Sequence, residues 1–206
     1  MTQAAAILIR DCSTEGSELD REERQAERAL IERAKADAGA YGQLYRSHYT
    51  AIAGYLFRRT GDEHAAEDLA SETFLSAWKA LPRYRDRGAP FRAWLMRIAT
   101  NKANRWSKAR KKELRQLARF DQAIGRLSVQ AADEAEQSGV NTALLSLAER
   151  DQTVLVLHHV EGMSVEQVGR VMGLRVGTVK SRLSRARDRL REELNQGQCE
   201  QEEVSS

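Results

Sequence analysis

The chain has 206 residues, enough for one large domain or two small ones. Two prolines and 6% aromatic residues argue against Pro-rich linkers and many-turned β-architectures, and favour an α-rich chain packed by small aliphatic side chains. The longest apolar run, residues 4–9, is too short to cross a bilayer, no signal peptide is readable, and two distant cysteines make no disulfide framework. We therefore expect a cytoplasmic protein without membrane insertion.

The first part of the chain predicts a helical bundle preceded by an extension. Residues 1–37 are polar with a thin apolar face, so we expect them to be mobile or weakly helical. Apolar side chains then recur at helical spacing within 41–56, 66–81 and 91–98, and Pro90 fits the first turn of the third helix. The polar stretch 100–104 interrupts this spacing before a basic helix over 105–120. Together these elements predict one all-α domain at 38–118.

The second part predicts a smaller helical domain. Residues 119–141 have weak periodicity, two glycines and several acids, which is typical of a flexible linker. A helix over 149–160 follows, then a short helix that opens with the capping-box pair Ser164 and Gln167, a turn at Gly173, and a last helix over 177–194. The domain is expected at 142–196, and 197–206 form an acidic tail. The fold class is therefore all-α, with two small helical domains joined by a flexible linker.

Charge is distributed unevenly, although the net charge is only +3. Residues 97–119 hold nine Lys or Arg and one acid, and residues 175–191 hold seven Lys or Arg and one acid. Residues 62–72 and 192–203 each hold five acids and no Lys or Arg. Two basic blocks indicate two contacts with a polyanion, whereas the acidic blocks indicate a basic protein partner or simply solvated faces.

Residues 164–187 are typical of a helix-turn-helix, because a capped helix and a glycine turn precede a helix with a basic outer face. Val179, Leu183 and Ala186 define the inner face of this last helix. In such a unit the second helix enters the major groove and reaches base edges. Candidate base contacts share the outer face: Lys180, Ser181, Ser184 and Arg185. Candidate phosphate contacts flank that face: Arg175, Thr178, Arg182 and Arg187. The alternative is an ordinary three-helix packing unit with a solvated basic helix.

The first basic block suits single-stranded nucleic acid, because Thr and Asn in a loop can hydrogen-bond an unstacked base while Lys and Arg follow the phosphates. The candidate residues are Thr100, Asn101, Lys102, Asn104, Arg105, Lys108 and Arg110. Trp106 can stack on a base or pack against the flank of the domain. Trp94 and Trp78 are at core spacing.

The acidic block suits a protein-docking surface. Asp68 and Glu72 lie one helical turn apart, beside apolar side chains. The candidate interface comprises Glu67, Asp68, Leu69, Glu72, Leu75 and Trp78. Metal ligation by these acids lacks a partner set of recognisable spacing, and the adjacent residues His158 and His159 cannot easily share one ion. We therefore expect no metal, no cofactor and no catalytic residues.

Three segments give the chain a resemblance to a known family: 66–74 (AEDLASETF), 91–101 (FRAWLMRIATN) and 176–187 (VGTVKSRLSRAR). In this order and spacing they resemble sigma-70 family RNA polymerase sigma factors of the extracytoplasmic-function (ECF) type. The resemblance covers about residues 41–194. It departs at Ser71, where the family often has Gln, and at Arg105, where it often has Asp.

The resemblance implies a role for each surface and no chemistry of the chain's own. The helix around Asp68 and Glu72 would dock on the clamp helices of the largest subunit of core RNA polymerase. The segment 100–105 would capture a flipped base of the promoter −10 element during melting, and the helix beginning near Gly177 would read the duplex −35 element. The bundle would correspond to sigma region 2 and the helix-turn-helix domain to sigma region 4.

Rival interpretations and the mode of control stay open at this point. One rival is a stand-alone helix-turn-helix activator that binds duplex DNA directly, and another is a small helical metal hydrolase using Asp68, Glu72 and a histidine. For control, we expect a separate anti-sigma protein that holds the two domains in a compact arrangement and covers the Asp68 face. The alternative is self-inhibition by the acidic tail or the N-terminal extension.

Overall fold

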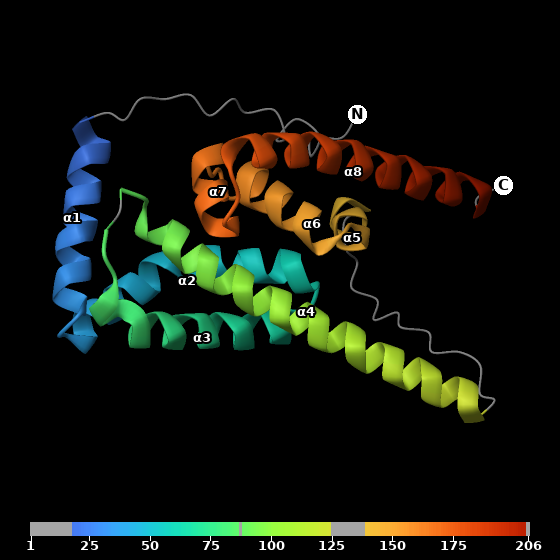
Figure 1. Ribbon diagram of the computed structural model, residues 1–206, viewed down its shortest axis with the longest axis horizontal. Coiled ribbons are helices and arrows are strands. Elements are labelled where there is room, and N and C mark those ends of the chain that lie inside the picture. The colour runs from blue at the N-terminus through green and yellow to red at the C-terminus, as the bar shows by residue number, and fades with distance from the viewer. Residues whose placement is uncertain (1–17, 87, 125–138, 205–206) are drawn as a thin grey trace.

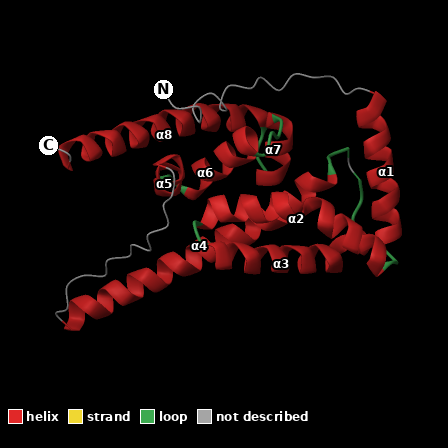
Figure 2. Ribbon diagram, turned by 180° about the vertical axis from the view of Figure 1, so that it is seen from behind, coloured by secondary structure: helices red, strands yellow, loops and turns green. Residues whose placement is uncertain are grey.

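The computed structural model describes residues 18–86, 88–124 and 139–204, and within these ranges every regular element is helical (Figures 1 and 2). We name helices α1–α4 the N-terminal domain and helices α5–α8 the C-terminal domain. The N-terminal elements are α1 (Glu18–Ala34), α2 (Ala38–Thr60), α3 (Glu63–Ala80), the short helix η2 (Leu81–Arg83) and α4 (Phe91–Ile124). The C-terminal elements are α5 (Gly139–Ser146), α6 (Glu149–Leu155), the π-helical turn η3 (Val156–Val160), α7 (Val165–Met172) and α8 (Val176–Val204). None of the described helices is long and apolar enough to traverse a bilayer.

The N-terminal domain is a bundle in which α2, α3 and the first half of α4 share one core. Asp37 and Asp62 cap α2 and α3 by accepting hydrogen bonds from backbone N–H groups of the first turns. Gly61 ends α2 in the left-handed region, with φ 70°, so α3 can fold back beside α2. The helices meet through buried side chains such as Leu44, Tyr55 and Phe74.

The expectation that residues 1–37 are mobile or weakly helical is wrong for the described part of this segment. Residues 18–34 form α1, which packs against α2 (Figure 1). Ile31 is only 4% exposed and Ala34 is fully buried, so the thin apolar face is sufficient for docking. On its outer side Arg28 pairs with Asp86 at 2.6 Å, which joins α1 to the loop before α4. Residues 1–17 lie outside the described residues.

The expected break at 100–104 is also wrong, because α4 runs without interruption from Phe91 to Ile124. The polar residues continue the helix since the side facing the core remains small: Ala99, Thr100 and Ala103 are all buried. The buried Thr100 hydroxyl forms a hydrogen bond with the Tyr55 hydroxyl at 2.8 Å. Pro90 directly precedes the helix, and its carbonyl accepts from the N–H of Ala93.

The C-terminal domain follows the predicted order of helices, with three differences. An additional helix, α5, precedes them and begins at Gly139, within the expected linker. The helix expected over 149–160 is α-helical only to Leu155 and ends in the π-helical turn. The last helix continues beyond the expected end at 194, as far as Val204. Residues 125–138, most of the expected linker, lie outside the described residues.

The two domains contact each other directly. Helix α7 lies against α4, and α5, α6 and η3 lie against α2. Helices α4 and α8 both extend past the body of the molecule on the same side (Figure 1). The arrangement places the helix-turn-helix beside the N-terminal half of α4.

Candidate nucleic-acid and protein interfaces

The helix-turn-helix is built by local hydrogen bonds that the sequence predicts. The Ser164 hydroxyl accepts from the backbone N–H of Gln167 at 3.3 Å, and the Gln167 side chain accepts from the N–H of Ser164 at 3.0 Å. Gly173 ends α7 with φ 68°, a conformation that favours glycine. The capping box and the glycine turn are therefore confirmed.

Gly169 is a determinant of this unit that sequence reasoning missed. A Cβ atom at this position would lie 2.8 Å from the carbonyl oxygen of Leu174. The backbone is fixed there because the N–H of Leu174 donates to the Gly169 carbonyl at 2.9 Å. The absence of a side chain thus permits the close approach of α7 and the turn. A glycine four residues before the turn glycine was the available signal.

The faces of α8 lie as the spacing predicts. Val179, Leu183 and Ala186 are buried, and the four candidate base contacts Lys180, Ser181, Ser184 and Arg185 are exposed. Arg175, Thr178 and Arg187 are also exposed, whereas Arg182 is half-buried. The side chain of Arg185 folds along the helix and donates to the Ser181 carbonyl at 3.3 Å.

The contacts of His158 and His159 fit a structural role. A ring nitrogen of His158, Nδ1, lies 2.8 Å from the Met163 carbonyl oxygen. Burial, together with the nearby His158 and Arg187, lowers the pKa of His159 to about 4. Among the described residues, no group of three or more His, Cys, Asp or Glu is placed to hold a metal ion.

The candidate single-strand residues are distributed around α4. Asn101, Arg105, Lys108 and Arg110 are exposed, but Thr100 is 4% exposed and points into the core toward Tyr55. Lys102 is half-buried and pairs with Glu72 of α3 at 2.8 Å. Trp106 is half-buried against the core. The exposed face thus presents Asn101 and three cations, while Thr100 supports the helix from within.

Asn104 is engaged by Arg59, a residue that sequence reasoning did not single out. Nη2 of Arg59 donates to Oδ1 of Asn104 at 2.9 Å. The same guanidinium donates through Nη1 to the Glu149 carbonyl at 3.1 Å and to the Gln152 side chain. Arg59 is 2% exposed, and it joins α4 of the N-terminal domain to α6 of the C-terminal domain.

The candidate docking surface forms one exposed face of α3. Glu67, Asp68 and Glu72 are exposed, and beside them Leu75 is 54% exposed. Trp78, expected at core spacing, is 36% exposed and rests on the ring of Tyr41. Leu69 is buried, so it supports this face from the core side.

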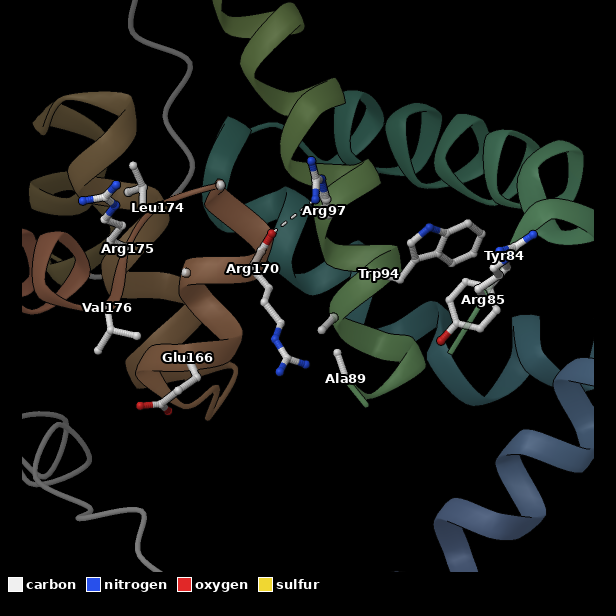
Figure 3. A pocket seen from close by; sticks show the side chains of 13 residues that line it. Tyr84, Arg85, Ala89, Trp94, Arg97, Glu166, Arg170, Leu174, Arg175 and Val176 are labelled. Carbon is white, nitrogen blue, oxygen red and sulfur yellow. Dashed lines mark hydrogen bonds between the residues drawn. The ribbon is translucent and has the colours of Figure 1, made fainter. Parts of the chain in front are cut away.

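A groove of about 940 Å³ lies between the domains, beside the helix-turn-helix (Figure 3). The α4 side contributes Tyr84 and Trp94, and the turn before α8 contributes Leu174 and Val176. Arginines from both domains line the same groove: Arg85, Arg97, Arg170 and Arg175. One carboxylate, Glu166, also lines the groove, so the lining combines an apolar surface with a net positive charge. Such a lining suits an acidic amphipathic segment.

Two family models match the chain, one in each domain. The model of sigma-70 region 2 matches residues 44–113, and the model of sigma-70 region 4 matches residues 139–190. The region 2 match includes α3 and the first part of α4. The region 4 match includes the helix-turn-helix and the first half of α8. Helix α1 precedes both matches.

Curated relatives align over most of the chain. The ECF RNA polymerase sigma factor SigW of Bacillus subtilis is 30% identical over 172 residues, which cover 78% of this chain and 91% of SigW. The RNA polymerase sigma-H factor of Pseudomonas aeruginosa is 32% identical over 178 residues, which cover 80% and 91%. The ECF RNA polymerase sigma factor BldN of Streptomyces coelicolor is 33% identical over 162 residues, which cover 76% of this chain but only 61% of BldN.

Two solved structures share the fold. CnrH, in complex with the cytosolic domain of CnrY, superposes with a TM-score of 0.63 at 32% identity, covering 82% of this chain and 97% of that chain. The sigma factor RpoE of Bartonella quintana, in complex with the anti-sigma factor NepR, superposes with a TM-score of 0.60 at 25% identity, covering 75% and 96%.

Proposed function

Because this chain belongs to the ECF group of sigma-70 family RNA polymerase sigma factors, we propose that it docks on core polymerase, recognises promoter −35 and −10 elements and assists melting. The observation that carries this proposal is the presence of two separate basic surfaces, one on each domain, together with an acidic face on α3. Polymerase supplies the chemistry of RNA synthesis. The role places the chain in the cytoplasm, with core polymerase and DNA.

For the −35 element, we assign base contacts to the outer face of α8 and phosphate contacts to its flanks. Arg185→Ala should cost about 1–3 kcal/mol at the −35 element and relax sequence preference there. Arg187→Ala should weaken binding to all sequences similarly and flatten the salt dependence. Binding to a randomised −35 duplex library measures both. Uniform losses in both variants would contradict the assignment of faces.

For the −10 element, we assign contact with unpaired DNA to the exposed residues of α4. Asn101 offers amide groups for a base edge, and Arg105, Lys108 and Arg110 offer charge for phosphates. Thr100 acts indirectly, since its hydroxyl bonds with Tyr55 and holds the helix in place. Lys102 and Asn104 can contact DNA only after they exchange their present partners, Glu72 and Arg59.

For polymerase, we assign docking on the clamp helices of the largest subunit to the exposed face of α3. An acidic face with Leu75 and Trp78 beside it suits a basic partner surface with an apolar centre. The buried Leu69 contributes by fixing α3 on the core.

For control, we propose that an anti-sigma protein binds the groove between the domains. The support is the combination of Trp94, Leu174 and Val176 with four arginines, and the presence of anti-sigma partners in structures of similar chains. An acidic amphipathic helix complements this lining. This site differs from the Asp68 face, which the sequence predicts as the surface that the inhibitor covers.

The decisive experiment is reconstitution with core RNA polymerase on a promoter library, read as transcript start sites. Specific initiation that depends on both promoter elements supports the proposal. Binding of a duplex operator by the free protein, without any polymerase-dependent initiation, would instead indicate a stand-alone activator.

A further inference from the structure

A short segment between η2 and α4, residues 84–86 and 88–90, forms part of the wall of the groove and has no regular secondary structure. Tyr84 of this segment lines the groove together with Trp94 of α4 (Figure 3). The centre of the Tyr84 ring lies 4.9 Å from that of Trp94, and the same ring meets the edge of Phe91 at 5.4 Å. The position of the segment therefore decides the shape of the aromatic end of the groove.

Helix α1 contacts this segment, although none of the described residues that line the groove belongs to α1. Nε of Arg28 lies 2.6 Å from Oδ2 of Asp86. The other oxygen of that carboxylate accepts a hydrogen bond from the N–H of Gly88 at 2.7 Å, and Gly88 has a φ of 74°, which favours glycine. One carboxylate thus turns the segment and connects it to α1.

Glu27 adds a second connection between α1 and the start of α4. Its carboxylate lies 3.2 Å from Nε2 of His48, and the His48 ring packs on Phe91, the first residue of α4. Burial, together with the nearby carboxylates of Asp86 and Glu27, raises the pKa of the Tyr84 hydroxyl to about 12. A charge on α1 therefore acts on a ring that lines the groove.

The anchoring of α1 makes it a fixed support for the segment. Ile31 follows Arg28 by one turn and is 4% exposed, and Ala34 is fully buried. Between α1 and the segment lies a cavity of about 50 Å³, so apolar packing between them is incomplete. The placement of the segment consequently depends on the pair formed by Arg28 and Asp86.

We propose that Arg28 is a positioning residue for the groove, because by holding Asp86 it keeps Tyr84 against Trp94 in the arrangement that receives an acidic partner segment. The identity of this partner rests on the function proposed above, whereas the placement of Tyr84 does not. Helix α1 precedes both family matches, so the support comes from outside the matched regions. Detachment of α1 would weaken binding in the groove without altering any residue that lines it.

Arg28→Glu tests the pair, because it places a second carboxylate beside Asp86. Arg33→Glu is the matched control, since it makes the same charge change at an exposed position of the same helix, five residues further and turned away from Arg28. Arg28→Lys keeps the positive charge and should behave like the wild type. Circular dichroism checks that each variant remains folded.

The first readout is the indole N–H signal of Trp94 in proton–nitrogen correlation spectra of the full chain, assigned with Trp94→Phe. We expect Arg28→Glu to shift this signal, because the Tyr84 ring moves relative to the indole, and we expect Arg33→Glu and Arg28→Lys to leave it in place. An unchanged signal in Arg28→Glu would overturn the positioning role. Equal shifts in Arg28→Glu and Arg33→Glu would overturn it as well, because they would show a general effect of charge.

The second readout is affinity for a fluorescein-labelled synthetic peptide of about 16 residues, with Glu and Leu on opposite faces of a helix, measured by anisotropy. An exposed ion pair shifts an equilibrium by up to about fivefold, and a less populated binding-competent state weakens binding by the same factor. Arg28→Glu should therefore bind the peptide about two- to fivefold more weakly than Arg33→Glu. Equal affinities would overturn the role of Arg28 in binding.

Arg170→Glu separates this inference from the proposed function. Arg170 lines the groove from the C-terminal domain, so its reversal should weaken peptide binding directly. Undiminished binding by Arg170→Glu would contradict the groove as the site of an acidic segment. The signal of Trp94 would still decide whether Arg28 positions the segment, so the two failures are distinguishable.

Discussion

Adding one methyl group at Gly169 should destabilise the C-terminal domain. The Cβ of Gly169→Ala would lie 2.8 Å from the Leu174 carbonyl oxygen and 3.7 Å from a methyl group of Val179. Neither neighbour can move independently, because Leu174 is bonded back to Gly169 and Val179 is fully buried. Overpacking of this kind costs about 1–3 kcal/mol. The higher helix propensity of alanine offsets at most about 1 kcal/mol of that cost.

We therefore expect a net loss of about 1–2 kcal/mol in the free energy of unfolding. Urea denaturation of the full chain, followed by a probe in the C-terminal domain, measures it. Gly177→Ala is the matched control, since its Cβ would meet no atom within 4 Å. That variant should be as stable as the wild type, or more stable by up to about 1 kcal/mol, because it gains helix propensity without a clash. Equal stabilities for the two variants would refute the close-approach argument.

Two further predictions concern the docking face and the half-buried His159. Asp68→Arg should weaken binding to core polymerase several-fold, mainly through the association rate, because it reverses an exposed charge opposite a basic partner; unchanged co-purification of a folded variant would contradict the assignment. His159 has a pKa of about 4 in the folded chain against about 6.5 unfolded, so the unfolded chain binds more protons between these values. The free energy of unfolding should thus rise from pH 4 to 6.5, and His159→Gln should reduce that slope in paired urea titrations. An unchanged slope would show that His159 is solvated.

Local signals in the sequence account for much of the fold. The helix-turn-helix follows from Ser164, Gln167 and Gly173, whose roles depend on atoms only a few residues away. The burial of Val179, Leu183 and Ala186 follows from helical spacing alone. The resemblance to ECF sigma factors, which the comparisons confirm, added the family to this local interpretation.

The errors arose where tertiary contacts decide the outcome. The polar stretch at 100–104 predicts a break because it interrupts the apolar spacing, but the hydroxyl of Tyr55, 45 residues earlier, accommodates Thr100 within the core. Helix α1 was underestimated because two buried positions, Ile31 and Ala34, are sufficient once α2 is present. Such partners are distant in sequence, so periodicity cannot reveal them.

The junction between the domains was predictable only in outline. A compact arrangement was expected from a separate inhibitor, whereas the described residues supply contacts of their own across the junction. Arg59 and Glu161 carry no local sign of this role, since a charged residue near the end of a helix is ordinarily solvated. Only their burial in the folded chain distinguishes them.

The unbroken helix α4 has a consequence for hydrogen exchange. Its first half is anchored by buried residues as far as Ser107, but every residue from Lys108 to Leu117 is exposed. The distal half therefore depends on local helix propensity and on pairs such as Arg110 with Glu113. Amide protons should exchange with solvent slowly along the anchored turns and rapidly beyond Ser107. The helix is continuous, but amide protons in its two halves should differ in protection from hydrogen exchange. The boundary between the halves lies beyond the polar stretch at 100–104.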